Sequence, residues 1–192
     1  MSDPVALWHA EHVNFAALLD LLEGQLDRFK RGAPPDYELM LDIMYYMTRY
    51  PDVLHHVKED LAFARIGQRE AGVRPVVDRL TEQHARLKQS GDALVLALDG
   101  IVNGAITLRD HVNAPGRAYV ADFRSHMQVE EVTILPLAAR LLHDGDWAAI
   151  DGAIQHIDDP LFSNQAEERY SALRRKIARA ARAPKADAMP QA

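Results

Sequence analysis

The sequence predicts an all-α fold, an up-down four-helix bundle with a short C-terminal helical extension. Apolar residues recur at alternating spacings of three and four along four long stretches, which is the pattern of helices that pack at shallow angles in a bundle. Proline and glycine separate several of these stretches, as expected at helix ends. The chain has 192 residues, 48% of them hydrophobic, which is enough for one domain with a sizeable core.

We expect this single domain to have three parts. Residues 1–145 form the predicted bundle, and residues 146–183 form a helical extension of the same domain. In the extension a short helix and a turn precede a last helix over about 164–182. Residues 184–192 are rich in Ala, Pro and Lys and offer almost nothing apolar to anchor them, so we expect a disordered tail.

The first helix is predicted over residues 4–30. Ser2 or Asp3 supplies an N-cap, Pro4 suits the first turn, and glycine and proline after residue 31 end the helix. One polar residue, His12, lies in the inward-facing stripe, and a single buried histidine is more often a hydrogen-bonded core residue than a ligand. The stripe comprises Trp8, His12, Phe15, Leu19, Leu22, Leu26 and Phe29.

Two middle helices follow. One spans residue 37 to about 66 and carries Pro51, which removes a backbone hydrogen bond and predicts a kink or a helix restart. The other spans about 75–104, and a second histidine, His84, interrupts its apolar stripe. Burying imidazoles in two facing stripes is costly unless they find each other or a ligand. Gly91 in this helix is expected to let a neighbouring helix approach closely.

The second stretch carries a histidine and a carboxylate on one helix face. His55 and Glu59 stand four residues apart, so their side chains lie one above the other. His56 projects about 100° away from His55 on an α-helix. On spacing alone, His56 with Asp60 fits as well as His55 with Glu59.

The fourth helix repeats this pattern. Asn113 is its expected N-cap, before Pro115, and the helix runs to about Leu142. His126 and Glu130 again stand four residues apart on the apolar face.

The glutamates on these two faces indicate a bound cation. A buried carboxylate without a partner costs several kcal/mol, and no Lys or Arg lies in the stripes near Glu59 or Glu130. Four histidines and two glutamates on four helices are typical of a two-metal carboxylate site in a bundle. Nitrogen and oxygen ligands without sulfur suit iron, manganese or zinc, and two carboxylates that can bridge favour a pair of iron ions.

The composition excludes several other classes of protein. A net charge of −6 and a pI near 5.8 give no electrostatic footprint for nucleic acid or an anionic membrane. The absence of cysteine excludes disulfides, thiolate ligands and iron–sulfur clusters held by the chain. No apolar run approaches the roughly 20 residues needed to cross a bilayer, and no signal peptide is evident. We therefore expect a soluble, cytoplasmic protein. The sequence is compatible with a homo-oligomer but does not specify one.

Several other titratable residues do not belong to a histidine–glutamate pair spaced by four residues. Glu131, next to Glu130, is expected to face solvent or to support a ligand from outside. Tyrosines near the predicted site are candidates for a redox role, against ordinary packing as the commoner reading; they are Tyr45, Tyr46 and Tyr119. The other histidines are expected at the surface; they are His9, His111, His143 and His156.

With these motifs in order, the sequence resembles the hemerythrin-like, or HHE cation-binding, domain family. The resemblance covers nearly the whole chain and rests on four motifs, WHAEHVNFAALLDLLE, YPDVLHHVKED, EQHARL and HMQVEEVTILP. The later segments DWAAI and DPLFS are similar to the C-terminal extension of the family. The resemblance implies an up-down four-helix bundle with two non-haem iron ions, bridged by oxo or hydroxo groups. It assigns the metal to six residues, with His55 rather than His56: His12, His55, Glu59, His84, His126 and Glu130.

One position departs from the family pattern. The oxygen-carrying members have a third-helix histidine pair spaced by four residues, and here Lys88 stands four residues after His84. We therefore expect the metal ion near His84 to be the less protected one. The expected function is binding or sensing of oxygen, nitric oxide or iron. The alternative is a di-iron enzyme with peroxide, nitric oxide, ferroxidase or iron–sulfur repair chemistry.

Overall fold

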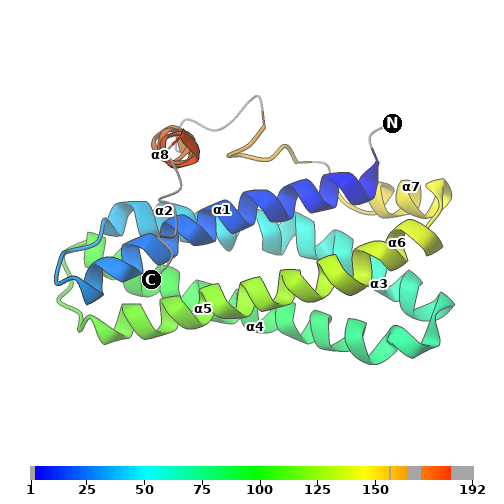
Figure 1. The fold of residues 1–192 in the computed structure, drawn as a ribbon, viewed down its shortest axis with the longest axis horizontal. Helices are drawn as coiled ribbons and strands as arrows, with labels where there is room; N and C mark the ends of the chain where they lie inside the picture. Colours follow the sequence, from blue (N-terminus) through cyan, green and yellow to red (C-terminus); the bar gives the residue numbers. More distant parts are fainter. Residues whose placement is uncertain (1–2, 156, 164–169, 183–192) are drawn as a thin grey trace, which may run out of the picture.

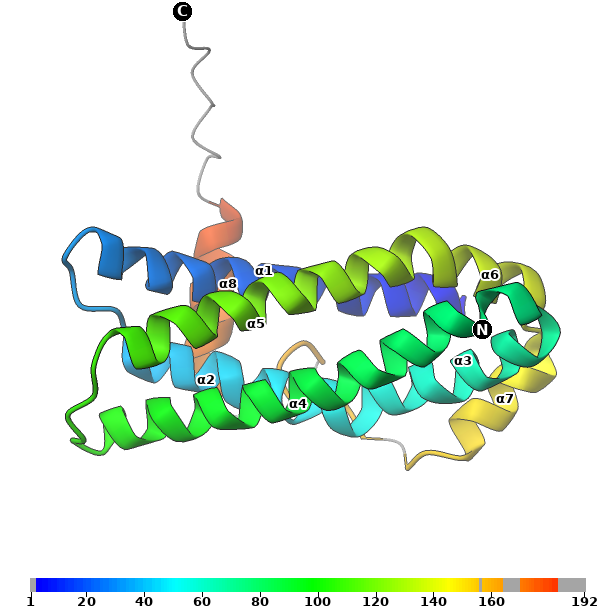
Figure 2. The same ribbon diagram turned by 90° about the horizontal axis from the view of Figure 1, so that it is seen from below.

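The computed structural model describes residues 3–155, 157–163 and 170–182, and these confirm the predicted all-helical bundle (Figure 1). Four long rods run side by side and alternate in direction (Figure 2). No strand occurs within the described ranges. The elements are α1 (Pro4–Lys30), α2 (Tyr37–Met47), η1 (Pro51–His55), α3 (His56–Arg69), η2 (Ala71–Val73), α4 (Arg74–Val102), α5 (Asp110–Val129), η3 (Glu130–Ile134), α6 (Leu135–Leu141), α7 (Asp144–Gly152) and α8 (Ser171–Arg182).

The first and third rods are each one helix, close to the predicted bounds. In α1 the Asp3 side chain accepts from the backbone N–H of Val5, and Pro4 opens the helix. The chain leaves α1 through Gly32, whose φ of 69° lies in the left-handed region that favours glycine. The third rod is α4, which packs against α2, α3 and α5.

The second rod confirms the helix restart expected at Pro51. α2 ends at Met47, where the Thr48 hydroxyl donates to the Met44 carbonyl at 2.9 Å. Pro51 then opens a π-helical turn, η1, and α3 continues from His56. Because proline has no N–H to donate, a regular α-helix cannot pass through this position without losing a hydrogen bond.

The fourth rod begins one turn earlier than predicted, so the expected N-cap at Asn113 is wrong. The Arg109 carbonyl accepts from the N–H groups of both Val112 and Asn113, which starts α5 at Asp110. Asn113 lies inside the helix, where its side chain accepts from Arg117 at 3.0 Å. Pro115 is tolerated because it lies near the start of α5 and removes only one helical hydrogen bond there. The rod continues through η3 into α6.

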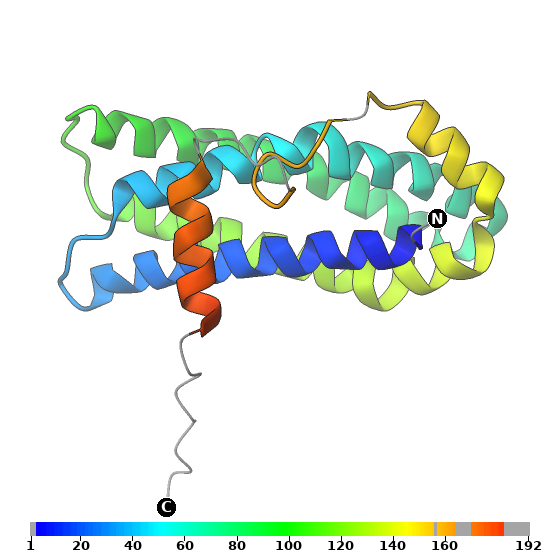
Figure 3. The ribbon, with the colours of Figure 1, turned by 90° about the horizontal axis from the view of Figure 1, so that it is seen from above.

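The C-terminal helices pack on the outside of the bundle. α7 lies against α3, and α8 crosses over α1 and α2 (Figure 3). Leu173 of α8 is buried in the larger of the two apolar clusters of the bundle. The start of the predicted last helix, residues 164–169, lies outside the described residues, and so do His156 and the predicted tail 184–192.

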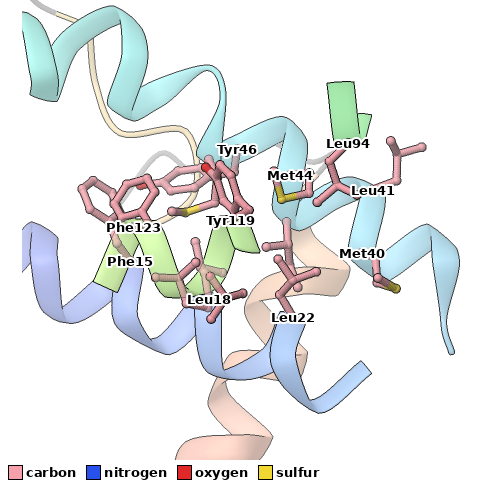
Figure 4. Close-up of a cluster of buried hydrophobic side chains, with 14 of the residues drawn as sticks. Phe15, Leu18, Leu22, Met40, Leu41, Met44, Tyr46, Leu94, Tyr119 and Phe123 are labelled. Atoms are coloured by element: carbon pink, nitrogen blue, oxygen red, sulfur yellow. The ribbon is translucent and has the colours of Figure 1, made fainter. Parts of the chain in front are cut away.

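Two apolar clusters fill the bundle. The larger apolar cluster is built mainly from α1, α2, α4 and α5, around Phe15, Leu22, Met44 and Phe123 (Figure 4). The smaller apolar cluster lies towards the other end of the rods and includes Trp8 and Phe63 together with Val77, Leu80 and Ile134. In each rod, buried polar residues occur where the chain passes from one cluster to the other. We call this set the polar layer: His12, His55, His56, Glu59, His84, His126 and Glu130.

Candidate metal centre

The histidines of the polar layer meet in two close pairs. The Nε2 atoms of His12 and His55 lie 3.1 Å apart, and those of His84 and His126 lie 3.0 Å apart. Two nitrogen ligands at about 2.1 Å from one ion, and at right angles to each other, stand about 3.0 Å apart. Each pair therefore has the separation expected of two ligands to one metal ion.

Glu59 reaches from one pair to the other. One of its oxygens, Oε1, lies 2.8 Å from His55 Nε2 and 3.4 Å from His12 Nε2. The other, Oε2, lies 3.2 Å from His84 Nε2.

Glu130 does the same from the fourth rod. Its Oε1 lies 3.1 Å from His126 Nε2, and its Oε2 lies 3.5 Å from His12 Nε2. Both glutamates thus contact both histidine pairs.

The glutamate oxygens are the feature that tests whether a metal fits. Glu59 and Glu130 are 1% and 0% exposed, yet Glu59 Oε2 and both oxygens of Glu130 have no hydrogen-bond partner within the described part of the chain. Leaving buried carboxylate oxygens unpaired costs several kcal/mol unless a cation faces them. The layer combines these oxygens with imidazole nitrogens, which is a donor set that iron, manganese and zinc accept. The residues present therefore fit a metal.

Each histidine of the layer is held from outside by a side-chain acceptor on its second ring nitrogen. Such partners fix the tautomer and the ring orientation of metal-binding histidines. The Nδ1 atoms make these contacts: His12 with Glu131 at 2.7 Å, His55 with Glu11 at 2.7 Å, His56 with Asp52 at 3.1 Å, His84 with Asp60 at 3.0 Å and His126 with Gln83 at 3.1 Å. In these five rings, Nε2 is left as the nitrogen available to a ligand.

Two π-helical turns lie at the layer, one in each interrupted rod. η1 ends at His55, and η3 starts at Glu130. Each is next to a proline: Pro51 opens η1, and Pro136 follows η3. π-turns inside α-helices are frequent at functional sites, because they change where the following side chains point. The interruption at Pro51 was predicted, whereas no sequence signal had been read for the one at Glu130.

The carboxylates around the layer favour protonation of two of its histidines. Although burial favours the neutral ring, the charges of Glu59 and Glu11 raise the pKa of His55 to about 10. Burial acts in the same way on His84, whose pKa is raised to about 11 by Asp60, Glu130 and Glu59. Burial opposes the charged form of Glu59, but the neighbouring histidines hold its pKa well below the usual range. The protons on these histidines offset part of the negative charge of the carboxylates. A metal ion that binds here must displace those protons.

Residues that the sequence had not linked to the site also touch it. The Trp8 indole N–H donates to Glu59 and lies 3.1 Å from His12 Nε2. The Tyr50 hydroxyl donates to Glu11 at 2.8 Å, so this tyrosine connects to His55 through one carboxylate. Trp8 and His12 lie four residues apart on α1, whereas the contacts of Trp8 with Glu59 and of Tyr50 with Glu11 join different rods, so spacing along one helix gave no signal for those two.

The tyrosines singled out from the sequence lie elsewhere. Tyr46 donates to Asp159 at 2.9 Å, and Tyr119 is buried in the larger apolar cluster. Tyr45 is partly buried beside that cluster, with the Arg49 guanidinium 5.8 Å from its ring centre.

The other charged candidates lie around the layer. Glu131 is 28% exposed and supports His12 from outside, as one of its two expected roles. Asp60 contacts Nδ1 of His84 at 3.0 Å, and Nδ1 of His56 contacts Asp52 at 3.1 Å. Lys88 is 58% exposed and pairs with Asp92 at 2.9 Å. The surface position expected for three histidines is confirmed: His9, His111 and His143 are exposed.

A cleft of about 1200 Å³ opens beside one half of the layer. It lies between α1, α3, α7 and the segment around residues 154–163. His55 and Glu59 line its inner part together with Trp8, Glu11 and Tyr50. His55 therefore places its side of the layer next to the cleft.

Comparison with known proteins adds one finding. Residues 3–138 match the sequence model of the hemerythrin HHE cation-binding domain, a span that runs from the cap of α1 into α6. Searches of curated proteins and of solved structures gave no match. Along the described ranges, no helix has the length and apolar character needed to cross a membrane.

Proposed function

Since this chain belongs to the hemerythrin HHE cation-binding domain family, we propose that its polar layer holds two iron ions. The proposed ligands are the six residues assigned from the sequence, now found together in the layer: His12, His55, Glu59, His84, His126 and Glu130. A di-iron centre supplies binding or reduction of oxygen and nitric oxide. The proposed function is to bind or sense one of these gases, or iron itself.

One observation carries the proposal of two ions. Glu59 and Glu130 each reach from the His12–His55 pair to the His84–His126 pair, and three of their four oxygens have no hydrogen-bond partner in the described residues. A single ion cannot face both nitrogen pairs and both carboxylates and still keep a position open for a ligand. Two ions use all six side chains.

The chain itself supplies orientation and exclusion of water. Apolar clusters close the layer at both ends, and the outer acceptors hold each imidazole with Nε2 directed inward. Trp8 adds an N–H donor at Glu59, the carboxylate next to the cleft. These features favour a preformed site with one accessible side.

The cleft supports an enzyme as the second candidate. A space of about 1200 Å³ is far larger than a diatomic gas needs, and small-molecule sites commonly occupy about 300–1,000 Å³. Its aromatic wall, with Trp8 and Tyr50, suits an organic or peroxide substrate that approaches Glu59. In this alternative the same two ions serve turnover instead of reversible binding.

Metal analysis tests the proposal directly. Protein loaded with ferrous iron without oxygen, then passed through a desalting column, is expected to retain about two iron ions per chain. One ion or fewer after complete loading contradicts the dinuclear site. Lys88→Ala, a change at an exposed side chain, is the control and should leave the stoichiometry unchanged.

Absorbance spectra then separate the two functions. Loaded protein is exposed to oxygen, nitric oxide or peroxide. A spectral change that reverses when the gas is removed supports binding or sensing. Consumption of many equivalents of gas or peroxide per chain supports the enzyme.

A further inference from the structure

The cleft beside the polar layer lies between the bundle and the C-terminal part of the chain. Its inner wall comes from α1, η1 and α3, and its outer wall comes from α7 and the segment around residues 154–163 (Figure 3). The outer wall follows the span 3–138 that matches the family model. The family match therefore does not specify what the cleft binds.

Aromatic and aliphatic side chains form part of both walls. Trp8 of α1 and Trp147 of α7 meet edge to face, with ring centres 6.5 Å apart and planes at 86°. Leu7 and Ile157 also line the cleft, and they remain 54% and 48% exposed. Large apolar side chains left open in a cleft are typical of a site for an organic molecule. A bare metal ion would gain nothing from them.

The charged side chains of the cleft are mostly acidic. At its inner end, Glu11 and Glu59 both contact the ring of His55, at 2.7 Å and 2.8 Å. Among the other described lining residues Lys58 is the one cation, and it lies 3.7 Å from Asp151. Five aspartates share this part of the lining: Asp3, Asp144, Asp151, Asp158 and Asp159. A cleft with this excess of one sign attracts ligands of the opposite charge.

We propose that the cleft binds an organic cation, an amine with an apolar body. The aspartates attract the ammonium group, and the faces of tryptophan rings stabilise it through cation–π contact. The apolar body then covers Leu7 and Ile157. Binding requires no metal, so this inference goes beyond the proposed di-iron function.

Tryptophan fluorescence of the metal-free full chain tests the proposal. The chain has two tryptophans, Trp8 and Trp147, and both line the cleft, so their emission reports on its occupancy. Three probes share one phenylethyl body and differ in charge: 2-phenylethylamine, 2-phenylethanol and 3-phenylpropionate. Excitation is set where the phenyl ring does not absorb.

The amine is expected to change the emission saturably and to bind about tenfold more tightly than the alcohol, because it adds cation–π contact and charge attraction. The carboxylate should bind more weakly than the alcohol. No saturable change with the amine, or an affinity no higher than that of the alcohol, overturns the proposal.

Two variants at exposed side chains give opposite expected shifts. Asp151→Asn removes a negative charge and should weaken amine binding about two- to fivefold, whereas Lys58→Gln removes the opposing cation and should strengthen it by a similar factor. Neither should change the affinity for the alcohol. Asp78→Asn, at an exposed carboxylate of α4 outside the cleft, is the control. Equal shifts for amine and alcohol would show that charge does not select the ligand.

Failure of this inference is distinguishable from failure of the proposed function. A chain that retains two iron ions but does not prefer the amine overturns the cleft assignment alone. A chain that prefers the amine but retains one iron ion or none overturns the di-iron function alone.

Discussion

The larger apolar cluster and the polar layer are built from the same helices by the same spacing, yet they differ in what they need. Phe15 and Leu22 (Figure 4) continue the stripe of α1 that contains His12, and all three residues are buried. The apolar side chains are satisfied by each other. The layer keeps carboxylate oxygens without partners in the described residues. The larger apolar cluster needs no further partner, whereas the polar layer presents carboxylate oxygens that a cation can bind.

Helix geometry differs between the two regions as well. Around the larger apolar cluster, the rods are α-helical and approach closely. Gly91 confirms this, because a Cβ atom there would lie 2.6 Å from Thr48 Cγ2. At the layer, two rods change to π-turns. The fold thus keeps regular helices where packing alone matters, and it gives up regularity where side chains must converge.

The largest expected effect comes from the carboxylates of the layer. Glu130→Gln and Glu59→Gln each remove the charge of a proposed bridging ligand while keeping its size, and each is expected to abolish retention of the proposed metal pair. Metal binding that is coupled to folding contributes on the order of 10 kcal/mol, so the melting temperature of each variant should no longer rise when iron is added. Thermal unfolding with and without iron measures this.

The metal-free glutamine variants sharpen the comparison. Glu59→Gln removes the charge that pairs with the buried His55, so its metal-free form is expected to be less stable than the metal-free parent. A glutamine variant that still retains two ions would contradict the account of the layer.

Truncation in the larger apolar cluster should do the opposite. Leu22 is fully buried, so Leu22→Ala is expected to lower the free energy of unfolding by about 2–5 kcal/mol, with or without metal. The number of ions per chain should not change. Urea unfolding together with metal analysis checks both statements, and a loss of metal would show that the two regions are coupled.

The pH dependence of stability should also come from the layer. His55 has its pKa raised from 6.5 to about 10 in the folded protein, so its contribution to stability is fully present below pH 6.5 and is lost as pH rises through 10. Metal-free protein is therefore expected to become less stable between about pH 6.5 and 10.

Urea titrations across this range test the pH dependence. Leu22→Ala should shift the whole curve without changing its slope, because it has no titrating group. A flat profile for the metal-free parent would contradict the proposed charge pairs.

The smallest expected effect belongs to the outer carboxylates. Glu131→Ala and Asp60→Ala leave His12 and His84 without their Nδ1 partners, so metal affinity should fall about 10–100-fold. Two ions should still bind at saturation. Competition with a chelator measures the affinity, and Glu82→Ala, at an exposed carboxylate of α4, is the control.

Much of the fold could be predicted from residue spacing. The stripes located the rods, Asp3 and Pro4 marked the start of α1, and Pro51 marked the restart of the second rod. The N-cap predicted at Asn113 was wrong, because an asparagine two residues before a proline is also the pattern of a helix start. In the structure the Arg109 carbonyl accepts the first backbone hydrogen bonds, so the helix begins earlier. Local signals at helix ends compete, and their outcome depends on the turns around them.

The sequence by itself determined which side chains face inward on each helix. That was enough to select His12, His84, His126 and both glutamates, because burial on a helix follows a fixed period. Their role as ligands remains a prediction, but the structure does bring them into one layer.

Only the tertiary structure decided which side chains of different rods contact each other. Trp8 at Glu59 and Glu11 at His55 are contacts between rods, and spacing along one helix carries no information about them. His56 is buried in the layer next to His55, at the junction of η1 and α3, although the spacing of a regular α-helix places only one of two adjacent residues on the inward face. The helical repeat determines which residues lie on the inward face of a helix. The partners of those residues depend on how the rods pack against each other.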